Sequence, residues 1–104
     1  MHATIRRYEG VDVTRINEVV GKVNETLVPK LRELPGFAGY YLIEGSGGVL
    51  SSLGLFETSE QADKSTMLVS NWITDQHFDK VIPSAPKITS GKVVARSDRV
   101  LATV

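Results

Sequence analysis

The sequence predicts an α+β domain whose elements run in the order strand, helix, strand, strand, helix, strand (βαββαβ). Three observations predict it: a short alternating segment at the start, two longer segments in which apolar residues recur every three or four positions, and two apolar segments joined by Gly-Ser-Gly-Gly. This order is typical of the ferredoxin-like fold, a four-stranded antiparallel sheet with two helices on one face. We expect the 104 residues to form one domain, with its core in about residues 2–96.

The first strand is predicted for residues 2–8, HATIRRY, because these residues alternate and favour extended backbone. Successive side chains on a strand point to opposite faces, so Ala3 and Ile5 share one face. Arg6 and Arg7 also face opposite ways, and the one that enters a buried surface needs an acidic partner or a bound anion. The face opposite Ala3 carries Thr4, Arg6 and Tyr8.

A long amphipathic helix is predicted for residues 14–34, preceded by Asp12 and Thr14 as capping candidates. Pro29 lies inside this segment, where it removes one backbone hydrogen bond, so we expect a kink in the last turns. Pro35 and the glycine after it end the helix. The apolar stripe consists of Ile16, Val19, Val20, Val23, Leu27, Leu31 and Leu34.

Residues 37–44 and 49–57 predict two antiparallel strands of a hairpin. The segment between them, residues 45–48, contains three glycines, which adopt positive φ readily and therefore suit a tight turn. Both strands are apolar at most positions of both registers, whereas an antiparallel sheet with one face in water carries polar residues on that face. Two helices cover only one face. The sequence therefore predicts a homodimer in which two open sheet faces meet, with the helices outside.

The second helix is predicted to begin after Thr58, which forms a capping box with Gln61, and to continue to about Thr74. Asp75 is a candidate cap for one further helical turn, which would contain His77. The apolar positions of these two segments are Ala62, Ser65, Leu68, Val69, Trp72, Ile73, Phe78 and Val81.

The last strand is predicted for residues 88–96, after Pro83 and Pro86 interrupt the helical pattern. Residues 98–104 are interpreted as a tail that can extend this strand. The sequence contains no repeat and no low-complexity tract.

The composition excludes several functional classes. Twelve basic and twelve acidic residues cancel, and no basic run is longer than Arg6-Arg7, so nucleic acid is not an expected partner. Charges throughout the first 25 residues argue against a secretory signal, and no 18 apolar residues run together, so we expect a cytoplasmic protein without membrane contact. Because the chain has no cysteine, it has no disulfide and no thiolate chemistry. His2 and His77 make no metal-ligand spacing, and no metal or cofactor is predicted.

Several stretches resemble one superfamily. The end of the first helix with the following strand, LVPKLRELPGFAGYYL, the passage LGLFETSEQAD, and the dipeptide HF are similar to the dimeric α/β barrel proteins, and in particular to the antibiotic biosynthesis monooxygenase-like domain. The stretches MHATIRRYEGVD, NWITDQHF and ITSGKVVAR look like the small uncharacterised members of that group. The resemblance implies a cofactor-independent monooxygenase that acts on a small aromatic, quinol or polyketide-like molecule. The alternative is a non-catalytic domain, small-molecule-binding or stress-associated.

The same resemblance suggests candidate site residues. His77 would take or hold a proton and Trp72 would line the pocket, as the two catalytic candidates. Each has a structural alternative: Trp72 lies on the apolar stripe of its helix, and His77 reaches the same side only if the chain bends after Thr74. If Trp72 is sealed in the core and His77 points to water, the enzyme hypothesis loses these residues. The substrate-binding candidates are Tyr41, Arg7, Asn71 and Ser51.

Overall fold

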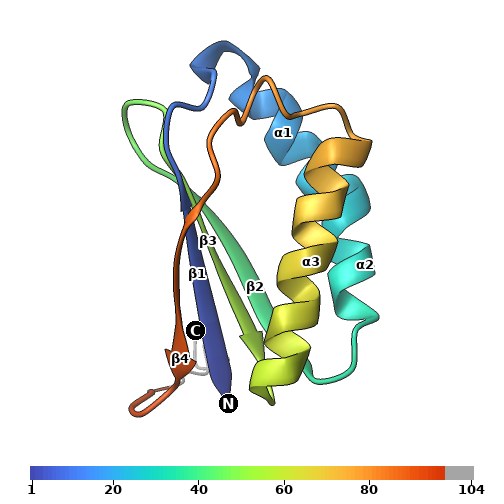
Figure 1. Ribbon diagram of the computed structural model, residues 1–104, viewed down its shortest axis with the longest axis vertical. Coiled ribbons are helices and arrows are strands. Elements are labelled where there is room, and N and C mark those ends of the chain that lie inside the picture. Colours follow the sequence, from blue (N-terminus) through green and yellow to red (C-terminus); the bar gives the residue numbers. More distant parts are fainter. Residues whose placement is uncertain (98–104) are drawn as a thin grey trace, which may run out of the picture.

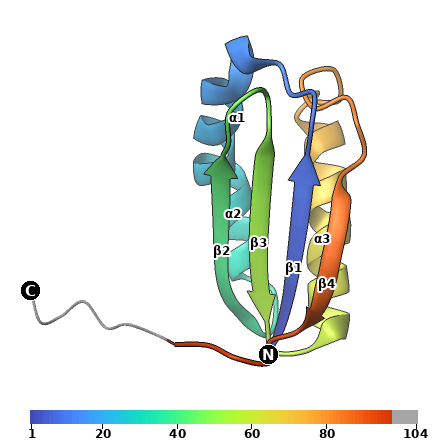
Figure 2. The same ribbon diagram turned by 90° about the vertical axis from the view of Figure 1, so that its left-hand side faces the viewer.

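The computed structural model describes residues 1–97 and has the predicted ferredoxin-like architecture. Its four-stranded sheet has the order β2-β3-β1-β4, and all neighbouring strands are antiparallel. The helices cover one face (Figure 1), and the other face is open along its whole length (Figure 2). The strands are β1 (His2–Tyr8), β2 (Phe37–Glu44), β3 (Leu50–Phe56) and β4 (Lys87–Lys92).

The first helical region is continuous but changes geometry along its length. Asp12 caps it, because its carboxylate accepts a hydrogen bond of 3.0 Å from the Thr14 amide. A wider π-helical turn directly precedes Pro29. Since the proline ring would clash with the carbonyl four residues earlier in a regular α-helix, the wider turn accommodates it. The segments are a 3-10 turn (Val13–Arg15), α1 (Ile16–Lys22), the π turn (Val23–Leu27) and α2 (Val28–Arg32).

The third helix, α3 (Ser59–Asp75), begins with the predicted capping box. The Thr58 amide donates to Gln61 Oε1 at 3.1 Å, and the Gln61 amide donates to Thr58 Oγ1 at 3.2 Å. Each bond satisfies a backbone N–H group that has no carbonyl partner within the first helical turn.

Two predictions near the end of the chain need correction. After α3 the chain forms hydrogen-bonded turns rather than a further helical turn, since His77 adopts a left-handed backbone with a φ of 61°. The last strand ends at Lys92 instead of residue 96, because Lys92 already lies opposite His2 at the start of β1. Beyond the Val93 amide, which donates to the Met1 carbonyl, β1 offers no further partner. The predicted tail, residues 98–104, lies outside the described residues.

The core lies between the sheet and the helices. It includes Leu27, Leu31, Leu50, Val69, Trp72, Phe78 and Val81. The open face of the sheet instead carries large apolar side chains with high exposure: Ile5 at 43%, Tyr41 at 60% and Ile43 at 57%. No helix formed by residues 1–97 is both long and apolar enough to cross a membrane.

Candidate ligand-binding cleft

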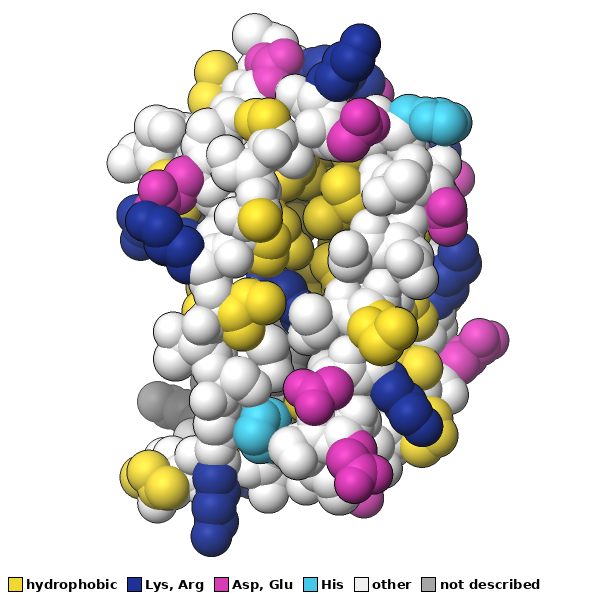
Figure 3. Space-filling model, viewed as in Figure 1, with side chains coloured by type: hydrophobic (Ala, Val, Ile, Leu, Met, Phe, Trp, Pro, Cys, Tyr) yellow, Lys and Arg dark blue, Asp and Glu magenta, His cyan; other side chains and the backbone are white. Residues whose placement is uncertain are grey.

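A cleft of about 340 Å³ opens between the β1–β4 edge of the sheet, α3 and the loop that joins α3 to β4. Figure 3 looks onto this side of the molecule and shows the hollow between the strand layer and α3, with hydrophobic side chains in its walls and a basic side chain inside. Its volume is at the lower end of the range of small-molecule sites, roughly 300–1,000 Å³. Its walls include Tyr8, Ile73, Ile82, Pro83 and Ile88, with Arg6 and Thr66 among the polar groups.

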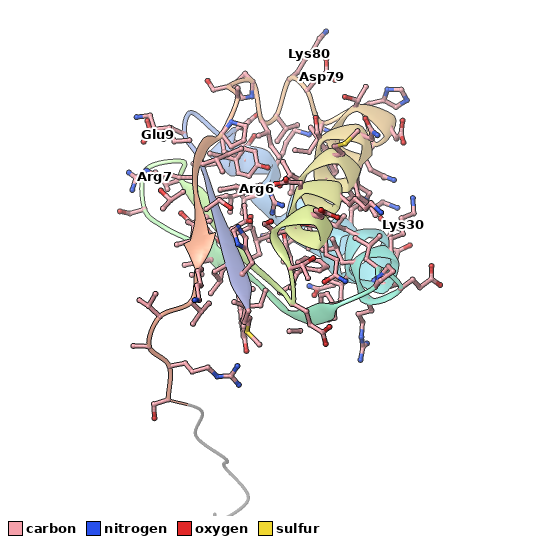
Figure 4. The ribbon with its side chains drawn as sticks, turned by 60° about the horizontal axis from the view of Figure 1, so that its bottom comes forward. Arg6, Arg7, Glu9, Lys30, Asp79 and Lys80 are labelled. Carbon is pink, nitrogen blue, oxygen red and sulfur yellow. The ribbon has the colours of Figure 1, made fainter. Side chains whose placement is uncertain are left out.

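Arg6 lines this cleft from β1 and is only 1% exposed. The alternation of β1 turns Arg6 toward the helices together with Thr4 and Tyr8. The neighbouring strand leaves room for the long side chain: Ser52 lies directly opposite Arg6, and a Cβ at Gly54 would lie 3.9 Å from Arg6 Nη1. Figure 4 shows Arg6 between the sheet and α3.

The guanidinium of Arg6 is held by hydroxyl groups of α3. Its Nη2 donates to Ser65 Oγ at 3.0 Å and to Thr66 Oγ1 at 2.7 Å. The Ser65 hydroxyl donates in turn to the Ala62 carbonyl at 2.6 Å, so its lone pairs are available to Arg6. Among residues 1–97, Arg6 forms no ion pair, and its buried Nε has no hydrogen-bond partner.

Burial shifts the pKa values of the ionisable groups around this arginine. It lowers the pKa of the Arg6 guanidinium below its usual value, whereas the neighbouring Tyr8 and Tyr40 act in the opposite direction. Burial also raises the pKa of Tyr8, and it raises the pKa of Tyr40 to about 12. An arginine remains protonated in proteins, so at neutral pH the inner end of the cleft holds one positive charge beside protonated phenols.

Trp72 and His77 do not meet in the structure. Trp72 is 3% exposed and packs against Phe78 with ring centroids 5.6 Å apart, while its Nε1 donates to Thr26 Oγ1 at 2.8 Å. The chain does bend after α3, but the bend brings Phe78, and not His77, against Trp72, and His77 is exposed. Neither residue lines the cleft. Their catalytic roles stay untested predictions.

The four substrate-binding candidates also lie away from the cleft. Asn71 is exposed on α3, and Arg7 is on the open sheet face, where its Nε donates to Glu9 at 2.8 Å. Tyr41 lines a separate hollow of about 330 Å³ on that face. Ser51 pairs with Arg7 across the strands and therefore shares the open face. Their substrate-binding roles remain untested predictions.

Sequence reasoning missed Arg6, Tyr8, Ser65 and Thr66 as one group. One usable signal was present, because Ser65 is a polar residue within the apolar stripe of its helix. A buried serine at such a position needs a hydrogen-bond partner, and Arg6 provides it. No three His, Asp or Glu side chains in residues 1–97 come together in a way that could hold a metal ion.

Comparisons with known proteins support the fold. No family model matches the chain, and no curated protein matches it in sequence. A monooxygenase of Streptomyces coelicolor, solved with the ligand nanaomycin D, superposes with a TM-score of 0.71 over 95% of this chain and 92% of its own, at 12% identity. An antibiotic biosynthesis monooxygenase superposes with a TM-score of 0.67 over 91% of this chain and 100% of its own, at 17% identity.

A dimeric ferredoxin-like protein from an uncultured marine organism superposes with a TM-score of 0.62 over 94% of this chain and 97% of its own, at 13% identity. The ferredoxin-like fold and the structural resemblance to antibiotic biosynthesis monooxygenases are thus confirmed. At these identities the likeness establishes the fold and leaves the activity open.

Proposed function

We propose that this chain binds a small, largely apolar molecule in the cleft between β1, β4 and α3. The observation that carries the proposal is the cleft itself, an apolar hollow of about 340 Å³ into which a few buried polar groups converge. Such a combination is the usual form of a ligand site. The solved monooxygenase adds that a protein of this fold binds a small-molecule ligand, nanaomycin D.

Filling the cleft tests this proposal. Ser70 is exposed on α3 and lines the cleft, so Ser70→Trp would place an indole in it without altering the core. Met67→Trp is the matched control, because Met67 also belongs to α3, is exposed and does not line the cleft. Titration calorimetry with a series of naphthalenes and naphthoquinones should show binding to the wild type and to Met67→Trp, and at least about 10-fold weaker binding to Ser70→Trp. Equal binding by both variants would place the site elsewhere.

Oxidation of the bound molecule is the second candidate function. A cation beside the ligand favours the phenolate form of a phenol, and a phenolate can donate an electron to oxygen without a cofactor. The buried charge of Arg6 in the cleft is the observation that favours this chemistry. In a monooxygenation of this kind, one oxygen atom enters the substrate, the other leaves as water, and the substrate supplies the electrons.

Oxygen consumption with a panel of hydroquinones separates the two functions. Turnover that is lost in Ser70→Trp supports an oxygenase at the cleft. Binding without oxygen uptake supports a binding protein. Trp72→Phe and His77→Ala, assayed in parallel, test the roles predicted for those residues: loss of turnover in His77→Ala with binding intact would assign the chemistry to a group outside the cleft.

We also propose that the chain forms a homodimer through its open sheet face. Tyr41 of β2, Leu53 of β3 and Ile5 of β1 lie side by side across three neighbouring strands on that face, and Ile43 adds a further exposed apolar side chain. Apolar surface of this kind is uncommon on monomers and is typical of interfaces. A second copy offers a sheet of the same shape and chemistry, as a two-fold interface requires.

A further inference from the structure

We propose that the ligand of the cleft carries an ionised oxygen acid, a carboxylate or a phenolate on an aromatic frame, and that Arg6 binds this group. The inference rests on the proposed function, since it assumes that the cleft takes a small molecule. It adds the chemical class of that molecule and the residue that selects it.

The first step is the charge of Arg6. The guanidinium is 1% exposed and forms no ion pair among residues 1–97. Ser65 and Thr66 offer it neutral oxygens, which stabilise a cation by their dipoles but leave its charge uncompensated. Buried charges in proteins are normally paired, because an isolated one is costly to remove from water. A negatively charged ligand supplies the missing partner.

The second step is the set of groups around Arg6. Across β1, β2 and β3 it faces Tyr8, Tyr40 and Ser52, none of which is negatively charged at neutral pH. Asp79 is the acidic residue of the cleft lining, but it is exposed and forms no ion pair with Arg6. Figure 4 shows Asp79 on the loop beyond α3, away from Arg6. The inner end of the cleft is therefore positive and its rim carries a carboxylate.

The third step is the free hydrogen-bonding capacity of the guanidinium. Arginine has five N–H donors, and the two bonds to Ser65 and Thr66 both come from Nη2. No hydrogen bond occupies Nη1 in residues 1–97, whereas the Nε–H group, which also lacks a partner, is buried beneath the cleft lining. A planar carboxylate matches the fork of a guanidinium, and a phenolate oxygen accepts from the same group. The apolar walls formed by Ile73, Ile82 and Ile88 suit the rings that such an acid would carry.

A buried arginine without an ion pair also lowers the stability of the fold. Replacing a buried unpaired charge by an apolar side chain of similar length commonly stabilises a protein. Residues that serve binding are often retained against stability. If Arg6 serves ligand binding, Arg6→Met should have a higher melting temperature than the wild type. If Arg6 instead stabilises the fold by its hydrogen bonds from β1 to α3, Arg6→Met should have a lower melting temperature.

A matched ligand series tests the inference. Binding of 2-naphthoate, 2-naphthol, 2-naphthamide and naphthalene is measured by titration calorimetry at neutral pH, with the wild type, Arg6→Met, Arg6→Lys and Arg32→Met. Arg32→Met is the control, because Arg32 is an exposed arginine of α2 that does not line the cleft. Charge-assisted hydrogen bonds are strong enough for an affinity difference of about 10- to 100-fold between 2-naphthoate and the neutral amide of the same shape.

We expect the wild type and Arg32→Met to prefer the acid, Arg6→Lys to retain part of the preference, and Arg6→Met to bind acid and amide equally. Absorption of the naphtholate ion in the bound complex at neutral pH identifies a phenolate site, whereas tighter binding of 2-naphthoate than of 2-naphthol identifies a carboxylate site. Equal affinity of the wild type for acid and amide would overturn the inference and leave the proposed function intact. Failure of all four compounds to bind would count against the proposed function itself. A lower melting temperature of Arg6→Met together with an unchanged preference for the acid would assign Arg6 to structure.

Discussion

The two faces of the sheet are built from neighbouring residues of the same types, yet they present opposite surfaces. Arg6 is buried on the helix side and Arg7 is exposed on the open side. Tyr40 is mostly buried on the helix side, whereas Tyr41 is 60% exposed on the open side. Strand alternation puts the two members of each pair on opposite faces, and the position of the helices decides which member is buried. Residue type alone therefore does not identify the site, because an arginine or a tyrosine is buried on the helix side at one position and exposed on the open face at the next.

Each face also carries groups without a suitable partner in the single chain. The helix side buries a cation without a carboxylate partner, and the open side exposes apolar side chains to water. The proposed occupants follow from these two deficits: an anionic ligand for the first face and a second copy of the chain for the second. Substitutions that change one face and leave the other unchanged test these two proposals separately.

The largest effect is expected from truncation on the helix side. Trp72→Ala removes a 3% exposed side chain, its contact with Phe78 and its hydrogen bond to Thr26. The expected loss in the free energy of unfolding is about 3–5 kcal/mol, measured by urea denaturation. Tyr41→Ala is the counterpart on the open face, and its loss should shrink as the protein is diluted, because its contacts belong to the dimer. Equal and concentration-independent losses would mean that the open face is part of the monomer's stability.

A charge placed on the open face should act on assembly instead. Ile43→Lys replaces an exposed apolar side chain of the proposed interface by an ammonium group, and we expect the dimer dissociation constant to rise by at least about 100-fold while the fold persists. Sedimentation velocity over a dilution series measures this. Met67→Lys is the control, because Met67 is 66% exposed on α3, outside the sheet. A wild type that sediments as a monomer at micromolar concentration would contradict the proposed homodimer.

Local patterns predicted most of the fold. The bounds 2–8 and 37–44 match the strands because alternation is a property of the strand itself. The capping box of Thr58 and Gln61 was predictable for the same reason, since its partners are three residues apart. The end of the last strand was not predictable, because it depends on where the neighbouring strand begins.

The candidate site depends on contacts between distant segments. The sequence predicted that Arg6 and Arg7 face opposite ways, but the choice between them requires knowing which face α3 covers. The serine of the α3 stripe and the small residues of β3 opposite Arg6 become meaningful only once those elements are paired. Trp72 and His77 stay apart because Phe78, and not His77, packs against Trp72 after the bend. The direction of this bend could not be read from residue spacing.

The smallest effect is expected at alkaline pH, and it again separates the two faces. Burial raises the pKa of Tyr40 from 10.0 to about 12, so the folded protein favours the protonated phenol. The stability that this provides is complete below pH 10 and is lost as the pH rises from 10 to 12, because the unfolded chain releases the proton first. The expected contribution is about 1–2 kcal/mol, allowing for the partial exposure of the side chain.

Urea denaturation of the wild type, Tyr40→Phe and Tyr41→Phe between pH 8 and 11 measures this contribution. Since phenylalanine has no proton to lose, Tyr40→Phe should lose less stability than the wild type over the upper part of that range. At concentrations where the protein is monomeric, Tyr41→Phe should follow the wild type, because the phenol that it removes is exposed and the buried phenol of Tyr40 stays in place. If the two variants instead follow the same curve, Tyr40 is no more enclosed than its neighbour, and the division of the sheet into a sealed face and an open one fails at β2.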